Sequence, residues 1–417
     1  MSGNDVMEIQ ALLKKMGYEV GAVDGVFGPQ MQDSVVAFQR RFGLTPDGVI
    51  GPATYRVLEV FLRGYDLYVI QPGDTFYAIA QKFGVPVGNI LTANPEQNPN
   101  NLQVGQRIVV PYDFPVVDTN INYTYSVLAR DIQGLKARYP FLETGSIGNS
   151  VLGRSLFYLR LGTGTNQVFY NGAHHALEWI TTPVLMKFAE DFLRAYARGE
   201  TLPGGYNPRE IWNGSSIYLV PMVNPDGVEL VLNGLQPDNP FYQDLITWNK
   251  GSTDFSTDWE ANNRGVDLNH NYNAAWEQSK AAEAEYGITG PGPTRYSGPY
   301  PVSEPETQAM VAFTIRHPFR LVMAYHSQGE VIYWNFMDMA PPEGRIIGES
   351  LSQISGYALD QTTGIASYAG YKDWFIQDFR RPGYTIEVGL GKNPLPISQF
   401  DQIYADNIGM LLYAATV

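Results

Sequence analysis

Five runs of apolar residues between positions 155 and 389 constrain the fold of this chain more than any other feature. They are rich in Val, Ile, Leu, Tyr and Phe, and this continuous apolar character suits strands buried on both faces. Helical patterns lie between the runs, for example after Thr182 and Pro183, which we expect to be the cap and first residue of a helix. The pattern predicts an α/β domain. The runs are SLFYLRLG (155–162), QVFYNGA (167–173), SIYLVPMVN (216–224), RLVMAYHS (320–327) and GYTIEVG (383–389).

Composition excludes several classes of function. The net charge of −14 argues against nucleic acid as a partner, because phosphate contacts need clustered Lys and Arg. No apolar tract is long enough to span a bilayer, and MSGNDVMEIQ lacks the features of a secretory signal. There is no cysteine, so a transition metal would be held by His, Asp or Glu. The five histidines are His174, His175, His270, His317 and His326.

Polar residues follow or end three of the apolar runs. Ligand sites of open α/β sheets gather at the carboxyl ends of the strands. His326 and Glu387 stand at such ends, and GAHHALEWITTP (172–183) follows another. A catalytic zinc takes three protein ligands and leaves one position open, and a nearby carboxylate can serve as base. Within HHALE both His174 and His175 are at helical spacing from Glu178, so spacing leaves the choice between them open.

Two short segments precede the α/β region. Residues 1–63 show helical periodicity and two similar turns, DGVFGP (24–29) and DGVIGP (47–52), which predict a small three-helix domain. With the run AFQRRFGLTPDGVIGPAT, these turns make the segment resemble the type 1 peptidoglycan-binding domain family.

Residues 66–111 read as strand, helix, helix and strand, with Asp74 or Thr75 as cap of the first helix. This βααβ segment resembles a LysM domain, which implies binding to the N-acetylglucosamine-containing glycan of peptidoglycan or to chitin. A proline-containing linker, PYDFPVVDTN (111–120), leads to the α/β region. The matching residues are Tyr68, Gly73, Asp74, Thr75, Ile79, Ala80, Asn94, Gly105 and Gln106.

Residues 120–417 resemble the zinc carboxypeptidases of the M14 family, which implies a mixed-sheet catalytic domain holding one zinc ion. The resemblance implies His175, Glu178 and His326 as zinc ligands and leaves His174 as a neighbour. It implies Glu387 as the general base that activates water and later protonates the leaving amine. Asn269 falls where the family binds a substrate carboxylate. The matching stretches are HALEWIT (175–181), NPDG (224–227), GVDLN (265–269), HSQG (326–329), KDW (372–374) and TIE (385–387).

Departures from the family pattern indicate an unusual substrate. His270 replaces an arginine that clamps a C-terminal carboxylate, and Glu260 replaces an arginine that polarises the scissile carbonyl. The carbonyl-polarising role then passes to zinc, to Arg264 or to nothing. Ile365 replaces a phenolic tyrosine, for which Tyr368 or Tyr371 is the expected substitute. Lys372 lies at a specificity position, where a cation suits a substrate carboxylate.

Together with the two wall-binding modules, these features resemble the γ-D-glutamyl-diaminopimelate peptidases of spore-forming bacteria. The sequence therefore predicts zinc-dependent hydrolysis of peptidoglycan stem peptides, with glycan strands and stem peptides as partners. Two alternatives stay open: a general metallocarboxypeptidase, and a wall-binding protein without activity. We expect the protein at the cell wall or in a sporulation compartment.

Overall fold

The computed structural model describes residues 3–417, which form two compact units. One contains the described residues up to 122 together with 126–143, and the other contains 123–125 and 144–417. The predicted segments 1–63 and 66–111 thus share one unit. This unit also includes residues 126–143, which we expected in the α/β domain. None of the helices within residues 3–417 combines the length and the apolar character needed to cross a membrane.

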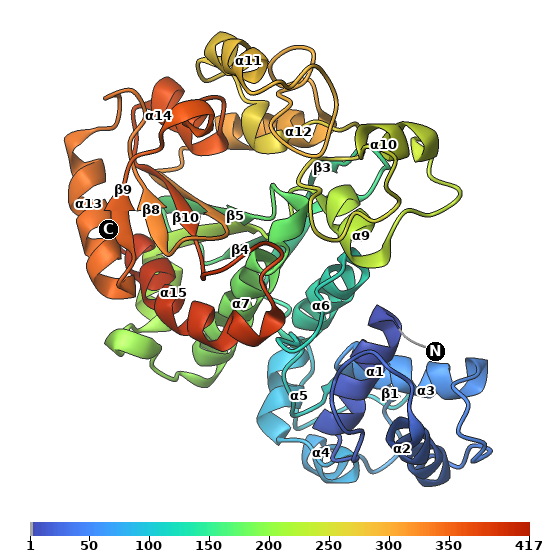
Figure 1. Ribbon diagram of the computed structural model, residues 1–417. Coiled ribbons are helices and arrows are strands. Elements are labelled where there is room, and N and C mark those ends of the chain that lie inside the picture. Colours follow the sequence, from blue (N-terminus) through green and yellow to red (C-terminus); the bar gives the residue numbers. More distant parts are fainter. Residues whose placement is uncertain (1–2) are drawn as a thin grey trace. The chain divides into compact units, whose positions relative to one another are not determined.

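The amino-terminal part of the first unit consists of α1 (Asn4–Lys15), α2 (Pro29–Arg41) and α3 (Pro52–Leu62) around a core that includes Phe38 (Figure 1). A buried glutamine from the helix before each repeated turn holds that turn. Gln10 accepts a hydrogen bond from Gly25 N at 2.7 Å, and Gln39 accepts one from Gly48 N at 2.9 Å. Both glycines have φ of 73°, which explains the Asp-Gly pair in each turn.

Residues 65–111 have the predicted strand–helix–helix–strand order. The two strands are antiparallel, with Tyr65 paired with Pro111 and Val69 paired with Arg107. Thr75, and not Asp74, caps the first helix by accepting a hydrogen bond from Ala78 N at 3.1 Å. Asn94 bonds both to Ile90 O and to Val109 O, each at 2.7 Å, and so ties the second helix to the second strand. The elements are β1 (Tyr65–Val69), α4 (Phe76–Phe83), α5 (Val87–Ala93) and β2 (Arg107–Pro111), and α6 (Tyr125–Arg138) follows.

The second unit is built on an eight-stranded mixed sheet of order β3-β4-β6-β5-β7-β10-β8-β9. All five apolar runs form strands, which confirms the predicted mixed-sheet α/β fold. They form β4 (Ser155–Leu161), β5 (Asn166–Gly172), β6 (Ser215–Val220), β7 (Leu321–His326) and β10 (Gly383–Glu387). Strands β6, β5, β7 and β10 pair in parallel. The strands β3 (Glu143–Asn149), β8 (Val331–Tyr333) and β9 (Ala358–Asp360) are polar or short, and the sequence did not predict them.

Helices cover both faces of this sheet (Figure 1). On one face, α12 (Pro305–Arg316) and α14 (Tyr371–Phe379) share a core with Phe169 of β5. On the other face, Tyr170 of β5 contacts the ring of Phe188 in α7 (Thr181–Arg198) and donates a hydrogen bond to Leu411 O in α15 (Phe400–Ala414). The expectation that Thr182 caps this helix was wrong: α7 begins at Thr181, and the hydroxyl of Thr182 donates a hydrogen bond to Pro221 O. The other helices of this unit are α8 (Pro208–Gly214), α9 (Pro225–Asn233), α10 (Tyr242–Trp248), α11 (Trp276–Glu285) and α13 (Pro342–Ser355).

Candidate metal centre and active site

The parallel central strands place the chemically important residues at one edge of the sheet. His326 is the last residue of β7 and Glu387 the last of β10, and these two residues pair in register. The chain leaves β5 at Gly172 and enters a 3₁₀ turn, Ala176–Glu178, that follows directly after His175. Since parallel strands end together, segments more than a hundred residues apart in sequence meet here.

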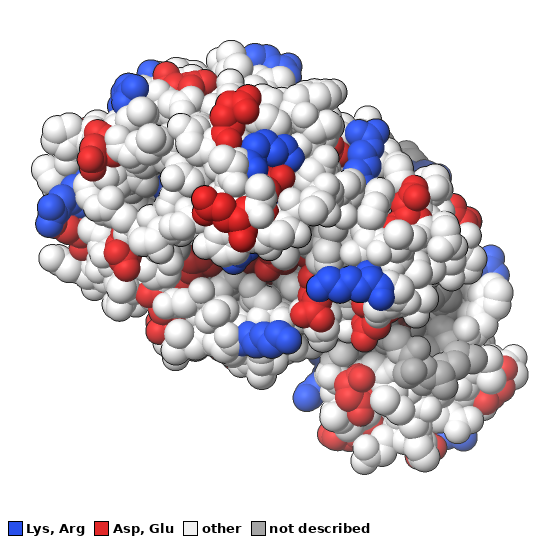
Figure 2. Space-filling view, turned by 45° about the horizontal axis from the view of Figure 1, so that its top comes forward, with Lys and Arg blue, Asp and Glu red and all other residues white. Residues whose placement is uncertain are grey.

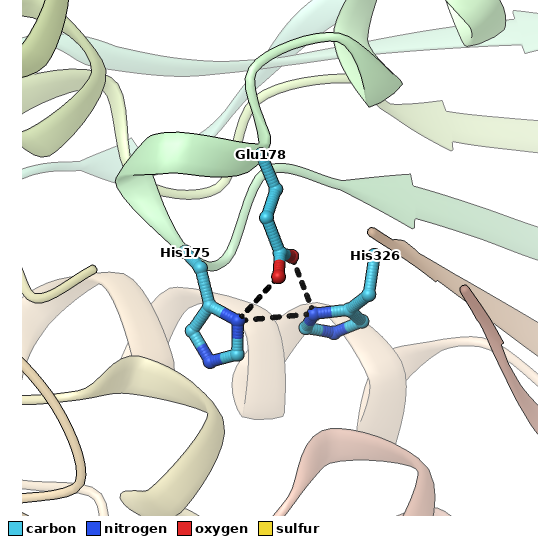
Figure 3. A group of neighbouring side chains, drawn as sticks. All are labelled: His175, Glu178 and His326. Carbon is cyan, nitrogen blue, oxygen red and sulfur yellow. Dashed lines mark hydrogen bonds and ion pairs between the residues drawn. The ribbon is translucent and has the colours of Figure 1, made fainter. Parts of the chain in front are cut away.

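His175, Glu178 and His326 converge on a common point (Figure 3). The Nδ1 atom of His175 lies 3.0 Å from Glu178 Oε1, and the Nδ1 atom of His326 lies 2.8 Å from Oε2 of the same carboxylate. The two Nδ1 atoms are 3.3 Å apart. Two imidazole nitrogens and one carboxylate that face one another in this way form a ligand set that suits a catalytic zinc ion and leaves a position open.

The electrostatics of the centre also suit a cation. Glu178 and His326 are almost fully buried. Burial alone would raise the pKa of Glu178, but the neighbouring His175 and His326 hold it at about 2, so the carboxylate is ionised. Burial likewise opposes the charged form of His175, yet the carboxylates of Glu178 and Asp267 hold the pKa of His175 well above its usual value. The surroundings of His175 are therefore strongly anionic.

His174 faces away from this point. Its Nε2 lies 3.0 Å from the hydroxyl of Tyr272, and its ring stacks on His326 with 5.6 Å between centroids. Burial and the neighbouring histidines lower the pKa of His174, so the ring is neutral. The structure thus brings His175, and not its neighbour, together with Glu178 and His326.

Asp267 supports His175 from behind, a role that the sequence reasoning missed. Its Oδ1 lies 3.2 Å from His175 Nε2, and its carboxylate also accepts hydrogen bonds from Asn269 N at 3.1 Å and Arg295 N at 2.8 Å. Burial opposes ionisation, but His175, His270 and these bonds hold the pKa of Asp267 far below its usual range. Metal-ligating histidines commonly pass their other ring N–H to such a carboxylate. The only signal in the sequence was the position of this residue inside the GVDLN stretch.

A cavity of about 620 Å³ opens beside these residues. Glu387 lines it, and burial together with the negative charge of Glu178 raises the pKa of Glu387 well above its usual value. Glu260 lines it too and accepts a hydrogen bond from the hydroxyl of Thr294; burial raises the pKa of Glu260. The space-filling view shows a hollow in the surface with acidic and basic side chains in and around it (Figure 2).

Three of the expected substrate-binding residues line the cavity: Asn269, His270 and Lys372. The ammonium of Lys372 is buried, 2.7 Å from Asn335 O and 2.6 Å from Asp373 Oδ1. Asn269 accepts a hydrogen bond from Tyr371 N at 3.0 Å. His270 is buried, and this burial lowers its pKa, so it is neutral and offers no cation to a carboxylate.

The structure does not bring Arg264 or Tyr371 to the cavity. Arg264 turns towards Glu304, with 3.6 Å between their charged atoms. The side chain of Tyr371 is fully buried, and its hydroxyl lies 2.9 Å from the hydroxyl of Thr314 in the core. Arg264 was expected as a replacement for the missing arginine and Tyr371 for the missing tyrosine, but packing directs both side chains away from the cavity.

Asn393 is a further residue at the centre that the sequence did not indicate. Its side-chain amide lies 3.4 Å from Glu178 Oε1 and donates to Ser327 O at 2.6 Å, next to His326. The hydroxyl of Ser327 returns a hydrogen bond to Asn393 Oδ1 at 2.8 Å. The loop after β10 is thereby tied to the end of β7 and to the carboxylate between the two histidines.

Comparison with known families agrees with this geometry. The zinc carboxypeptidase family model matches residues 128–409, more than half of the chain. The chain belongs to the zinc carboxypeptidase family. It is therefore a metallopeptidase with zinc as its cofactor, and His175, Glu178 and His326 fit that ion. A putative peptidoglycan binding domain matches residues 2–58 and a LysM domain matches residues 68–111, so this zinc peptidase carries modules for peptidoglycan.

Two bacterial relatives share most of the length of this zinc peptidase. Gamma-D-glutamyl-L-diamino acid endopeptidase 1 of Lysinibacillus sphaericus is 44% identical over 396 residues, covering 82% of this chain and 98% of the relative. The uncharacterized protein YqgT of Bacillus subtilis (strain 168) is 34% identical over 330 residues, covering 78% and 86%. Among solved structures, carboxypeptidase A from Helicoverpa armigera matches with a TM-score of 0.54 at 17% identity, covering 100% of this chain and 96% of that chain. That structural likeness shows the fold alone.

Proposed function

We propose that this protein hydrolyses the γ-D-glutamyl–meso-diaminopimelate bond of peptidoglycan stem peptides, and that its amino-terminal modules hold it on the glycan strands. The observation that carries the proposal is the convergence of His175, Glu178 and His326 beside Glu387 in a cavity that also contains a buried lysine. The relative from Lysinibacillus sphaericus, whose name states a γ-D-glutamyl-L-diamino acid endopeptidase, supports this choice of bond. We also propose residues 1–63, 66–111 and 120–417 as the three functional segments.

His175, Glu178 and His326 would hold the zinc ion, and Asp267 would fix the ring of His175. When bound, the ion polarises the scissile carbonyl and makes water more acidic. Glu387 ends the strand next to His326 and lines the same cavity. In this position its carboxylate takes a proton from the attacking water and later delivers it to the leaving amine.

Lys372 would select the substrate. Its ammonium is held by Asn335 O and Asp373 at one wall of the cavity, where it can bind a carboxylate of diaminopimelate. The neutral His270 at the position of the family's arginine clamp disfavours an ordinary C-terminal carboxylate there. A general carboxypeptidase activity is therefore the weaker candidate.

A decisive assay compares two peptides with the purified protein. A γ-D-glutamyl–diaminopimelate peptide should be cleaved at that bond, as shown by mass spectrometry of the fragments, and a standard α-linked peptide should stay intact. Glu387→Gln should lose cleavage but keep stoichiometric zinc. Release of C-terminal residues from the α-linked peptide alone would favour the carboxypeptidase. A zinc-containing wild type that binds cell wall but cleaves neither peptide would favour a binding protein.

A further inference from the structure

Three basic side chains line the cavity: Lys372, Lys392 and Arg295. Among the described residues, both lysines lie within ion-pair distance of a carboxylate, and Arg295 does not. Lys372 lies 2.6 Å from Asp373 Oδ1, and Lys392 lies 3.9 Å from Asp258 Oδ1. Arg295 has no carboxylate within ion-pair distance among residues 3–417; its guanidinium lies over the ring of Tyr286, 5.5 Å from the centroid. The charge of Arg295 is therefore available to a bound anion.

The backbone at Arg295 is held rigidly against the metal centre. Arg295 N donates to Asp267 Oδ2 at 2.8 Å, and Asp267 N donates to Tyr296 O at 2.8 Å. The preceding Thr294 bonds through its hydroxyl to Glu260. Arg295 also has φ of 64°, a left-handed conformation that is uncommon for a residue with a Cβ atom. Such strain persists where the surroundings over-determine the backbone, and it is frequent at ligand sites.

Arg295 also lies near the position where the family's clamping arginine is missing. His270 occupies that position, and its Nε2 lies 4.0 Å from Asp267 Oδ2, the oxygen that accepts the hydrogen bond from Arg295 N at 2.8 Å. Both residues therefore adjoin the same carboxylate oxygen. A guanidinium presents a planar pair of N–H donors that matches a carboxylate.

The cavity needs cations to admit an acidic substrate. The carboxylates of Glu178, Glu260, Asp267 and Glu387 all line it. A substrate carboxylate entering beside them would be repelled unless a cation faced it. Because Lys372 can meet only one such group, a second substrate carboxylate would be stabilised by another cation, and Arg295 is the basic side chain of this cavity without a carboxylate partner among residues 3–417.

We propose that Arg295 binds a substrate carboxylate other than the one bound by Lys372, so that productive substrates carry two acidic groups around the scissile bond. The inference rests on the function proposed above and extends it. A γ-D-glutamyl–diaminopimelate peptide has such groups, since the α-carboxylate of the glutamate stays free next to the γ-linked bond. An ordinary peptide with one terminal carboxylate does not.

The test is a cycle of protein and substrate changes. Wild type, Arg295→Gln and Arg295→Lys are assayed on three peptides: the fully acidic γ-D-glutamyl–diaminopimelate peptide, the same peptide with the glutamate α-carboxylate amidated, and the same peptide with the diaminopimelate carboxylates amidated. Arg295→Gln keeps the Cβ atom and so the backbone strain. The matched control is Arg345→Gln, because Arg345 is an exposed arginine on α13, outside the cavity lining.

Arg295→Gln should lower kcat/KM on the fully acidic peptide about 10- to 100-fold, as expected for loss of a hydrogen bond between charged groups. Arg295→Lys should recover part of this loss, and Arg345→Gln should show none. On one of the two amidated peptides the Arg295→Gln loss should disappear, because the carboxylate that Arg295 binds is already gone. The zinc content and the thermal midpoint should match wild type.

Two results would overturn the inference while leaving the proposed function intact. In both, wild type cleaves the fully acidic peptide. In the first, the kcat/KM of Arg295→Gln equals that of wild type on all three peptides; in the second, it is lower than that of wild type by the same factor on all three. If wild type cleaves none of the three peptides, the proposed function is refuted, and this inference with it.

Discussion

The contact between Asp267 and His175 can be tested by the substitution Asp267→Asn. In the structure the carboxylate accepts hydrogen bonds from two backbone N–H groups, of Asn269 and Arg295, and also faces His175 Nε2 at 3.2 Å. An asparagine has a single oxygen, so its NH₂ group must face at least one of these donors. Either His175 loses its acceptor, or the Arg295 N–H does.

The expected size of the effect follows from this arrangement. A carboxylate behind a metal-ligating histidine fixes the ring and makes it a better ligand, and its loss commonly costs 10- to 100-fold in metal affinity. This corresponds to about 1.4 to 2.7 kcal/mol of zinc binding free energy. We therefore expect Asp267→Asn to bind zinc about 10- to 100-fold more weakly than wild type.

The assay is competition for zinc against a chelator of known affinity, with Asp258→Asn as matched control. Asp258 is an exposed residue that lines the same cavity, and the substitution also removes one negative charge. We expect less than a twofold change for Asp258→Asn. Equal zinc affinity of Asp267→Asn and wild type would refute the supporting role, and equal weakening in both variants would show that only the net charge of the cavity matters.

Three further outcomes are expected. His175→Ala should lose stoichiometric zinc, whereas His174→Ala should keep it and show a lower thermal midpoint, because His174 bonds to the buried Tyr272; zinc loss in both variants would contradict the assignment. Lys372→Met should lower kcat/KM on diaminopimelate peptides about 10- to 100-fold and should also destabilise the fold, since buried Asp373 loses its partner. The double variant Lys372→Met/Asp373→Asn should regain stability but not activity. An unaltered kcat/KM of Lys372→Met would rule out that Lys372 binds the substrate. Burial raises the pKa of Glu306 to about 8, so its contribution to stability is fully present below its unfolded pKa of about 4.5 and is lost as pH rises towards 8. In urea unfolding, the wild type should therefore lose on the order of a few kcal/mol of unfolding free energy between pH 5 and pH 8.5, and Glu306→Gln should lose less. An identical pH dependence of the two proteins would contradict this effect of Glu306.

The fold of the catalytic unit followed largely from apolar runs. Buried strands such as β5 and β7 must be apolar along their whole length, so their positions could be read directly. The strands β3, β8 and β9 carry no such signal, because short or polar strands depend on pairing with a neighbour. The hydrogen bonds of Gln10 and Gln39 to the two repeated turns were also missed, since nothing local distinguishes a buried glutamine from an exposed one.

The residue types at the candidate metal centre were predictable, but part of their arrangement was not. Resemblance to the family pointed to His175, Glu178 and His326, and the geometry brings these three side chains together. Arg264 and Tyr371 were expected near substrate and lie elsewhere, whereas Asp267, Asn393 and Arg295 were not singled out and lie at the site. Side-chain direction depends on packing partners that are distant in sequence, and it decided each of these cases.

By itself the sequence determined the α/β pattern, the two amino-terminal segments and the absence of thiolate ligands, because hydrophobic period, turn residues and composition are local properties. Spacing alone could not choose between His174 and His175, since both can meet Glu178 within one helical turn. In the tertiary structure the hydroxyl of Tyr272 lies at Nε2 of His174, and Asp267 lies at Nε2 of His175, so that His175 is the one whose Nδ1 faces Glu178 and the Nδ1 of His326. The choice depends on partners more than ninety residues along the chain, and only the folded protein brings them together.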